Sequence, residues 1–524
     1  MRRLRASLAA HLPAFGFAAY PTVFLVGANA GIVPIDAAAV AQSLAVALGF
    51  AAILVAAAAL IPWQRDARLG WLSLVVLFCV LYQPIMAVAG LGGRLFTPDD
   101  AGAAAAFVLV IAVMAGAVVR PWESRTRSPL VLNAALAALF VASASGPLTR
   151  TIASGGERWQ STVDAQIARA LAGQSAPTPA QDIYYFVLDG FGRPDVLRSQ
   201  YGLDLTDFVK GLAAKGVGVA DSAHSNYAQT YLSLASTLNL TYLDDLAGVV
   251  GADARDRRPL RRLIDRNALM TAAKRAGYRV YSIGSDYGAT QTIAAADVCL
   301  CRRYGFDELQ TNVLALTPLG SLPLARWTYD AHRSKILDGL EAVDHVRTLA
   351  GPKFVFVHIL APHPPFVLGA DGRALRAKRP FDLGDGDDFR GEKDEYIQGY
   401  GDQVQYLAGR LLGLVQRLTD QSGPAPVIIM HGDHGPGSGL HWNSASASDV
   451  RERMAIFAAY AFPGEPAGLD PGITPINAAR FLARRYLGLN TPSLQDASYF
   501  STWEKPYRFI QIDAQTVRPA GPRG

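Results

Sequence analysis

Two stretches of this chain, residues 44–61 and 103–119, are long, apolar and free of any charged or polar side chain. A helix needs roughly 20 consecutive apolar residues to cross a bilayer core. Neither stretch is typical of a helix in a soluble domain, which keeps a polar face toward water. The sequence therefore predicts a chain that is partly embedded in a membrane.

Three further stretches are less purely apolar, and each is bounded by proline, arginine or aspartate, where the chain can leave the lipid. Together with the two uninterrupted runs they predict five spanning helices in a transmembrane domain of residues 1–150. The expected spans are residues 12–33, 44–61, 69–92, 103–119 and 129–147. The alternative is a cleaved signal peptide followed by buried helices of a soluble protein.

Arginines are distributed unevenly among the expected loops. Those before the first span or in the second and fourth loops are Arg2, Arg3, Arg5, Arg65, Arg68, Arg120, Arg125 and Arg127. The first and third loops carry Asp36, Asp99, Asp100 and only Arg94. Because basic residues accumulate on the cytoplasmic side, we expect a cytoplasmic N-terminus and, after five crossings, an outer domain on the opposite side.

The composition agrees with a membrane-bound protein, since mean hydropathy over the 524 residues is +0.17 and only 18% of them are charged. The formal net charge is +5, yet no basic run or basic-aromatic array marks a nucleic-acid surface, so we expect no nucleic-acid partner.

The chain has three cysteines and no CxxC pair, so a bound metal would have to be held by oxygen and imidazole ligands. Of these, Cys299 and Cys301 could form a disulfide, bind metal or remain free thiols.

A short segment separates the two parts of the chain. Residues 157–172 carry an apolar stripe at four-residue spacing, which predicts an amphipathic helix that either lies on the membrane interface or serves as a linker. Residues 173–181 are small, polar and rich in turn formers. We therefore expect a juxtamembrane segment over 151–181 and an outer domain over 182–524.

The outer domain alternates short β-rich runs with helical patterns, which predicts an α/β fold with a largely parallel sheet. The expected strands are 183–188, 279–283, 354–358, 427–430 and 455–460, and the expected helices lie near 205–215, 261–276, 331–347, 395–418 and 475–486. In such sheets ligands bind beyond the carboxyl ends of the strands. The chemistry should therefore be sought at those ends.

Metal-competent side chains follow two of the expected strands. Asp189 comes directly after the first strand and precedes a glycine; by itself it is also explained as an Asp-Gly turn. Asp433 and His434, flanked by glycines, follow the later strand PVIIM. Carboxylate oxygen and neutral imidazole nitrogen are suitable ligands for a divalent ion, and the glycines allow a close approach.

Five of the nine histidines lie between residues 358 and 441, at strand ends or in the loops beyond them. Besides His431 and His434, which precede and follow Asp433 in the run HGDHG, these are His358, His363 and His441. His358 is the weaker candidate, because a strand residue can point into the core. A single histidine would most often be structural, whereas a cluster at strand ends predicts a functional site.

A nucleophile is suggested by Thr230, where the polar run SNYAQ gives way to a helix. A hydroxyl at a helix N-terminus feels the positive end of the helix dipole, and a bound metal can lower its pKa further. The alternative is that Thr230 only caps the helix.

The set Asp189, Thr230, Asp433 and His434 resembles the alkaline-phosphatase/sulfatase superfamily, which has a strand-end acid, a hydroxyl or modified cysteine at a helix start and a later Asp-His-Gly in this order. Five membrane helices before an outer catalytic domain look like the lipid A phosphoethanolamine transferases and the lipoteichoic acid synthases. The run TYLSLA from Thr230 is similar to the Thr-Ala-Val-Ser-Leu-Pro run of the former at its Thr, Ser and Leu positions.

Two histidines extend the resemblance. His363 in HPPF resembles the substrate-phosphate histidine loop of both families, and His441 lies where a further phosphate- or metal-binding histidine is expected. The resemblance implies an α/β/α sandwich and a divalent ion, zinc, manganese or magnesium, held by Asp189, Thr230, Asp433 and His434. It further implies a phosphorylated Thr230, with His363 and His441 binding phosphate oxygens and protonating the leaving alcohol.

The resemblance also implies partners and a place in the cell. We expect a phospholipid donor of phosphoethanolamine or phosphoglycerol, an envelope glycan or lipid as acceptor, and a location in the bacterial inner membrane with the catalytic domain periplasmic or extracellular. The oligomeric state stays open. Two alternatives remain: hydrolysis by a membrane-tethered phosphodiesterase or phosphatase, and a non-catalytic envelope scaffold.

Three departures from the transferase pattern keep the hydrolase alternative open. Asp189 stands where the transferases usually have Glu, and Pro436 follows the Asp-His-Gly where many have Glu. Only two cysteines lie in the outer domain, so the several disulfides of phosphoethanolamine transferases cannot form. A strict sulfatase is disfavoured, because no Cys/Ser-x-Pro-x-Arg motif surrounds Thr230, Cys299 or Cys301.

Overall fold

The chain forms two compact units, which we describe separately. The computed structural model describes residues 2–29, 35, 37–60, 71–76, 138, 159–175, 177, 179, 181–301, 308–315, 324–377, 379, 381–420, 423–465 and 470–519. The first unit comprises residues 1–156, 305–329 and 376–381, and the second comprises the remainder.

The first unit contains two long apolar helices, α1 (Arg2–Asn29) and α2 (Ala37–Ala58), with α14 (Glu308–Ala315) packed against both. Residues 12–29 of α1 and all of α2 are long and apolar enough to cross a membrane. They correspond to the first two predicted spans. Of the other three, 103–119 lies outside the described residues, and 69–92 and 129–147 are described only at 71–76 and 138, so the count of five stays a prediction.

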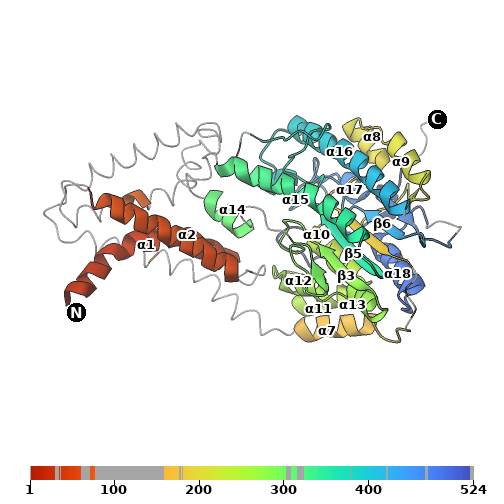
Figure 1. The fold of residues 1–524 in the computed structure, drawn as a ribbon, viewed down its shortest axis with the longest axis horizontal. Coiled ribbons are helices and arrows are strands. Elements are labelled where there is room, and N and C mark those ends of the chain that lie inside the picture. Colours follow the sequence, from red (N-terminus) through yellow and green to blue (C-terminus); the bar gives the residue numbers. More distant parts are fainter. Residues whose placement is uncertain are drawn as a thin grey trace. The chain divides into compact units, whose positions relative to one another are not determined.

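The second unit is built on a seven-stranded sheet in the order β2-β7-β6-β1-β5-β3-β4 (Figure 1). Five neighbouring strands, from β6 to β4, run parallel, while β7 is antiparallel to β6 and β2 is antiparallel to β7. The strands are β1 (Ile183–Leu188), β2 (Gly218–Val219), β3 (Arg279–Ile283), β4 (Val298–Cys299), β5 (Lys353–Ile359), β6 (Val427–His431) and β7 (Ala458–Ala461). The predicted α/β class with a mostly parallel sheet is confirmed.

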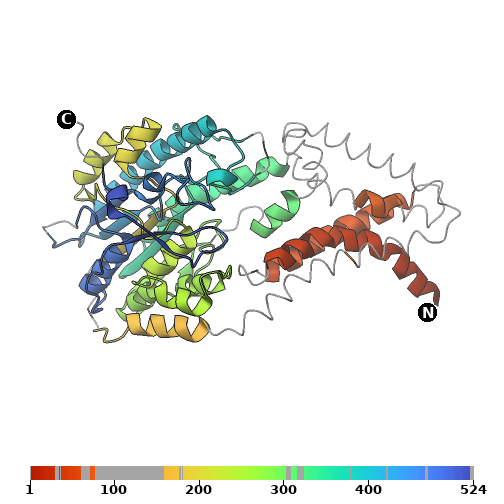
Figure 2. The same ribbon diagram turned by 180° about the vertical axis from the view of Figure 1, so that it is seen from behind.

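Helices cover both faces of this sheet (Figures 1 and 2). One face carries α8 (Pro194–Tyr201), α9 (Thr206–Ala213), α15 (Leu324–Arg347) and α16 (Lys393–Thr419). The other carries α7 (Trp159–Ala170), α10 (Thr230–Leu238), α11 (Asp244–Val250), α12 (Arg258–Asp265), α13 (Ala268–Arg275) and α18 (Pro475–Tyr486). Strands β1, β5 and β6 are fully buried, as expected for parallel strands covered on both sides.

Smaller elements complete the unit. They are a 3-10 turn (Gly386–Asp388), α17 (Val450–Met454), α19 (Ala514–Val517) and a two-stranded antiparallel sheet of β8 (Ser498–Phe500) and β9 (Ile510–Ile512). The predicted juxtamembrane helix is α7. It packs against α11, α12 and α13, and its Val163 is fully buried, so the helix belongs to the second unit.

Two predicted elements differ from the structure for local reasons. The helix expected over 261–276 is divided into α12 and α13, because the Asn267 side chain accepts a hydrogen bond from the Met270 amide and caps a new helix. The strand expected to start at 455 starts at Ala458 instead. Ala455 accepts a hydrogen bond from the Arg193 amide and Ile456 pairs with Gly192, so these residues contact the loop after β1 rather than β6.

The central strands should dominate the stability of the second unit. Ile429 on β6 is fully buried between β1 and β7, so Ile429→Ala should destabilise the unit by about 2–5 kcal/mol through a cavity. Ile510→Ala on β9, where the side chain is 45% exposed, should cost roughly 0.5 kcal/mol or less. Thermal unfolding of the two full-length variants measures the difference. Equal shifts of the unfolding temperature would contradict a dominant role of the central strands.

Candidate metal and phosphoryl-transfer site

Three adjacent parallel strands bring the predicted site residues to one edge of the sheet. Asp189 directly follows β1, Asp433 follows β6 after one glycine, and His358 lies one residue before the end of β5. Because β1 pairs with β6 on one side and β5 on the other, the three carboxyl ends lie side by side. The parallel strand order therefore explains why these residues lie close together, as the sequence predicted.

Glycines allow the two loops at this edge to approach each other. Gly190 adopts a left-handed φ of 76°, and its amide donates a hydrogen bond of 3.1 Å to Asp433 Oδ1. A Cβ atom on Gly432 would lie 2.5 Å from the carbonyl oxygen of Phe191. A larger residue at position 432 would therefore push the Asp433 loop away from the Asp189 loop.

Thr230 is the first residue of α10, and Gln229 takes the cap position before it. The Gln229 side-chain Nε2 donates to the Ser501 and Thr502 carbonyl oxygens at 3.0 and 3.1 Å, which anchors the residue before the helix. Thr230 Oγ1 is therefore not used for capping. It lies 3.0 Å from His434 Nε2, so Thr230 joins the cluster as predicted.

The donor atoms of this cluster fit a divalent ion. Asp189 Oδ1 and Asp433 Oδ2 are buried and have no hydrogen-bond partner among the described residues. One ligand atom from each of Asp189, Asp433 and His434 lies within 4.8 Å of the other two. His434 Nε2 is 3.6 Å from Asp189 Oδ1 and 3.4 Å from Asp433 Oδ2. Ligands of a tetrahedral ion bound at about 2.0–2.2 Å are separated by about 3.3–3.6 Å, so this spacing suits such an ion.

The protonation states also suit a metal. The Nδ1–H of His434 donates to the Gly435 carbonyl oxygen at 2.9 Å, which leaves the Nε2 lone pair directed into the cluster. Burial, and then the nearby Arg453, lower the pKa of His434, so the ring is neutral at physiological pH. Although burial alone raises the pKa of Asp189, the histidines His363, His358 and His434 together hold it below its usual range.

His363 lies beside the cluster. Its Nδ1–H donates to the Pro364 carbonyl oxygen at 2.6 Å, and its Nε2 is 3.9 Å from Asp385 Oδ2. The His363 ring centroid is 6.4 Å from that of His434, and its side chain is 13% exposed. A ring that is partly open to solvent and held through Nδ1 can exchange a proton at Nε2.

A buried ion pair between Arg453 and Asp385 completes the site, and the sequence did not predict either residue. Arg453 Nη1 donates to Asp385 Oδ2 at 2.6 Å, and Arg453 Nη2 lies 3.1 Å from His434 Nε2. Burial alone raises the pKa of Asp385, but Arg453, His363 and the Tyr396 hydroxyl lower it below its usual value. The site thus holds a fixed positive charge next to Thr230 and His434.

Nothing in the sequence around these two residues distinguishes them. Asp385 lies in the acidic run LGDGDDF and Arg453 in RERM, both of which read as solvated surface. Their burial depends on contacts from elsewhere. Arg453 Nε donates to the Ala228 carbonyl oxygen at 2.9 Å, and the Trp442 ring lies 5.2 Å from the guanidinium carbon.

The loop after His434 is held by Glu452. This buried carboxylate accepts hydrogen bonds from the Ser438 hydroxyl at 2.6 Å, the Gly439 amide at 2.7 Å and the Tyr201 hydroxyl. Burial raises the pKa of Glu452 above its usual value. A Cβ atom on Gly435 would lie 2.1 Å from the Glu452 carbonyl oxygen, so the turn after His434 requires glycine.

The structure does not bring His441 into the cluster. Its side chain is 52% exposed and Nδ1 lies 3.5 Å from Asp387 Oδ2. It precedes Trp442, which covers Arg453, so His441 is at the outer rim of the site. Its predicted catalytic role stays a prediction.

Cys299 and Cys301 form a disulfide at the end of β4, with their Cα atoms 5.2 Å apart. The sequence allowed a disulfide, metal binding or free thiols for these two cysteines, and the structure shows the disulfide. Neither cysteine belongs to the metal cluster.

The sequence model of a family described as Sulfatase matches residues 181–467, more than half of the chain. A comparison with curated proteins found no match.

Among solved structures, the integral membrane lipooligosaccharide phosphoethanolamine transferase A (EptA) of Neisseria meningitidis is similar at 14% identity and a TM-score of 0.39, covering 93% of this chain and 96% of that one. The C-terminal periplasmic domain of EptC from Escherichia coli, in complex with Zn, is similar at 13% identity and a TM-score of 0.41, covering 67% and 96%. Because neither of these TM-scores reaches 0.5, the family assignment rests on the sequence model.

Substitutions of Arg453 and Asp385 should have non-additive effects on the stability of the second unit. Arg453→Met leaves the Asp385 carboxylate buried without its cation and should destabilise the second unit by about 3–5 kcal/mol. The double variant Arg453→Met/Asp385→Asn removes both charges and should unfold at a higher temperature than Arg453→Met alone.

The exposed pair Arg198–Asp204 is the matched control, with side chains 61% and 68% exposed. Arg198→Met should cost less than about 1 kcal/mol. Thermal unfolding of the full chain measures these three variants and the single variant Asp385→Asn. If the losses of the two single variants add up to the loss of the double variant, the coupling is contradicted.

Proposed function

This chain belongs to the sulfatase family, and on that premise we propose that it is a metal-dependent transferase of phosphoryl head groups. It moves phosphoethanolamine or phosphoglycerol from a phospholipid to an envelope glycan or lipid through a phosphothreonine at Thr230. The observation that carries the proposal is the placement of Thr230 Oγ1 at 3.0 Å from His434 Nε2, beside two unpartnered carboxylate oxygens.

Asp189, Asp433, His434 and Thr230 would hold the ion. A bound divalent ion lowers the pKa of a coordinated hydroxyl and offsets negative charge on phosphoryl oxygens. Zinc, manganese and magnesium are all open for this site.

In the first half of the proposed reaction, the Thr230 hydroxyl gives its proton to solvent and Oγ1 attacks the donor phosphorus. The bond between phosphorus and the glycerol oxygen of the lipid breaks, and His363 protonates that oxygen so that diacylglycerol leaves. The Arg453 guanidinium, fixed by Asp385, lies where it can stabilise charge on the phosphoryl oxygens without reorganising.

In the second half, an acceptor hydroxyl attacks the phosphothreonine. His363, now without its proton, takes the proton of this hydroxyl, and the bond between phosphorus and Thr230 Oγ1 breaks. Thr230 Oγ1 takes up a proton from solvent, so that His363 Nε2 and the Thr230 hydroxyl both return to their starting states. His441 at the rim is placed to contact an outer part of a substrate rather than the reacting atoms.

A membrane location suits a lipid donor. The two long apolar helices α1 and α2 support membrane anchoring. We place the protein in the bacterial inner membrane with the second unit on the outer side, on the basis of the arginine distribution in residues 1–150.

A hydrolase that transfers the phosphothreonine to water is the second candidate, and Asp189 at the first-ligand position is the feature that favours it. A two-metal hydrolase would need a second set of free carboxylate or imidazole ligands near the cluster. Asp385, a buried carboxylate of the site, is already paired with Arg453.

Intact-mass analysis tests the proposed intermediate. The full chain isolated from native membranes and quenched in acid should carry a phosphoester adduct whose mass identifies the head group, and Thr230→Ala should abolish it. Ser233→Ala is the matched control, because Ser233 Oγ lies one turn further along α10, is buried and has no hydrogen-bond partner among the described residues.

Loss of the adduct in Ser233→Ala as well would speak against a specific role for Thr230. An adduct that persists in water and decays only with a glycan or lipid acceptor supports transfer. An adduct that decays equally fast in water alone supports the hydrolase.

The two histidines should differ in their effects on turnover. His363→Gln removes the proposed proton donor and should lower kcat about 10²- to 10⁴-fold at neutral pH. His441→Gln, at an exposed rim position, should change mainly KM. Release of diacylglycerol from phospholipid vesicles measures both variants, and a kcat loss in His441→Gln as large as in His363→Gln would contradict these roles.

A further inference from the structure

A chain of hydrogen bonds leads to the Oδ2 oxygen of Asp189. It starts at the Tyr287 amide, which donates to Ser285 Oγ at 3.0 Å. Ser285 Oγ is 2.9 Å from Thr290 Oγ1, and the two hydroxyl oxygens lie 3.2 and 2.6 Å from His358 Nδ1. The chain ends at His358 Nε2, which faces Asp189 Oδ2 at 3.4 Å.

The connectivity determines which nitrogen of His358 carries the proton. If Nδ1 carried it, Nδ1 and both hydroxyls would be donors within the triangle of His358, Ser285 and Thr290, and one buried hydroxyl proton would have no acceptor. With Nδ1 as an acceptor, every proton of the triangle has a partner. The proton of the neutral ring is then on Nε2, directed at Asp189.

His358 is only 1% exposed, and its Nε2 has no hydrogen-bond partner among the described residues apart from the 3.4 Å contact with Asp189. Asp189 Oδ1, the other oxygen of the same carboxylate, is also unpartnered and faces His434 Nε2 at 3.6 Å. One oxygen is thus directed toward a donor and the other toward the metal cluster.

We infer that His358 is a positioning residue for the metal centre: its Nε2–H holds Asp189 Oδ2, so that Oδ1 is presented to the ion. The inference rests on the metal site of the proposed function. It assigns a role to a histidine outside the cluster of Asp189, Asp433 and His434. Groups behind metal ligands commonly fix their orientation and tune affinity in this way.

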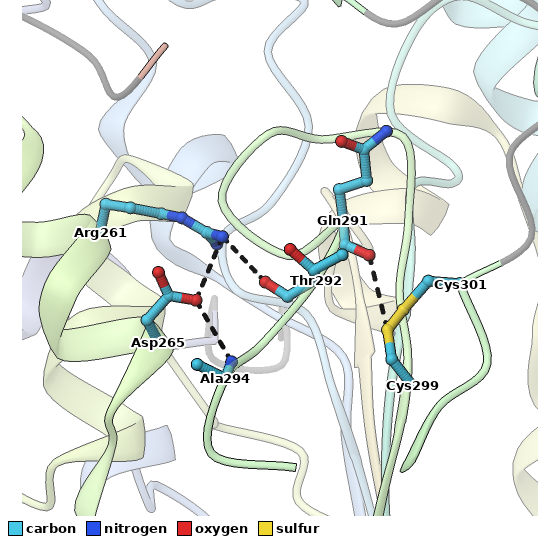
Figure 3. The surroundings of a disulfide bond; sticks show 7 residues. All are labelled: Arg261, Asp265, Gln291, Thr292, Ala294, Cys299 and Cys301. Atoms are coloured by element: carbon cyan, nitrogen blue, oxygen red, sulfur yellow. Dashed lines mark hydrogen bonds and ion pairs between the residues drawn. A yellow bond between two sulfur atoms is a disulfide. The ribbon is translucent and has the colours of Figure 1, made fainter. Parts of the chain in front are cut away.

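The loop that supplies Ser285 and Thr290 is held rigidly enough for this task. A Cβ atom on Gly284 would lie 2.4 Å from the Gln291 carbonyl oxygen and 2.6 Å from that of Thr290, so the loop closes tightly on its own start. Hydrogen bonds from the neighbouring helix hold the backbone on either side of Thr290, and the disulfide lies next to the residues that follow it (Figure 3).

Figure 3 shows the contacts made by the residues that follow Thr290. Arg261 of α12 donates to the Thr292 carbonyl oxygen at 2.8 Å and to that of Ala289, and Asp265 accepts from the Ala294 amide at 3.4 Å. Cys299, joined to Cys301, lies 3.8 Å from the Gln291 carbonyl oxygen. The disulfide thus borders the loop that orients His358.

Metal affinity tests the inference independently of turnover. Zn²⁺ binding to the full chain in detergent is measured by competition with a chromophoric chelator. His358→Leu, which lacks the donor, and Thr290→Val, which lacks the supporting hydroxyl, should each weaken binding about 10- to 100-fold. His358→Gln can still donate to Asp189 and should recover most of the affinity lost in His358→Leu.

Ser282→Ala is the matched control for the hydroxyl variant. Ser282 lies on β3 three residues before Ser285, is fully buried, and its Oγ has no hydrogen-bond partner among the described residues. The Ser282→Ala variant should bind Zn²⁺ as tightly as the wild type. Thermal unfolding of each metal-free variant shows whether a loss of affinity accompanies a loss of folding.

The outcomes separate this inference from the proposed function. Weaker binding in His358→Leu and Thr290→Val, with recovery in His358→Gln, supports it. Wild-type affinity in His358→Leu, while Asp189→Asn fails to bind, overturns it and leaves the metal site intact. Equal losses in His358→Leu and His358→Gln, in step with lower unfolding temperatures, indicate a packing role and also overturn it. If Asp189→Asn binds like the wild type, the proposed metal site itself is wrong.

Discussion

Two carboxylates, Asp189 and Asp433, are buried together at the carboxyl ends of adjacent strands, and the rest of the site depends on how their charge is compensated. Burying an ionised group is costly unless it is paired, hydrogen-bonded or bound to a metal. Asp433 Oδ1 accepts one hydrogen bond from Gly190, but Asp433 Oδ2 and Asp189 Oδ1 have no protein partner among the described residues. The fold thus leaves two buried carboxylates incompletely compensated, next to the Thr230 hydroxyl, and a cation bound there would stabilise them.

The surrounding groups contribute to the site in different ways. His434 is kept neutral and directs a lone pair at the cluster, while Arg453 supplies a permanent charge that Asp385 holds in place. His358 faces Asp189 through its own supporting hydroxyls. Each of these groups is buried, so their orientation is set by packing before any substrate binds, which is the condition for efficient electrostatic stabilisation of charge on a phosphoryl group.

Local patterns predicted much of the second unit. The strands at 183–188 and 279–283, the helix start at Thr230 and the carboxylates after two strands all follow from short-range preferences and from the rule that parallel strands place ligands at their carboxyl ends. The break at Asn267 was missed, because one side-chain cap outweighs the continuous apolar pattern of 261–276. Arg453 and Asp385 were missed because charged residues in polar runs are usually solvated.

The sequence by itself determined the α/β class of the second unit, the apolar helices of the first and the identity of Asp189, Thr230, Asp433 and His434, because periodicity and strand-end motifs are local properties. Only the tertiary structure decided which other residues reach the site. It brought Asp385 and Arg453 together across 68 residues, turned His358 toward Asp189 and left His441 at the rim. Burial and direction of a side chain depend on segments distant in the chain, and no local pattern encodes them.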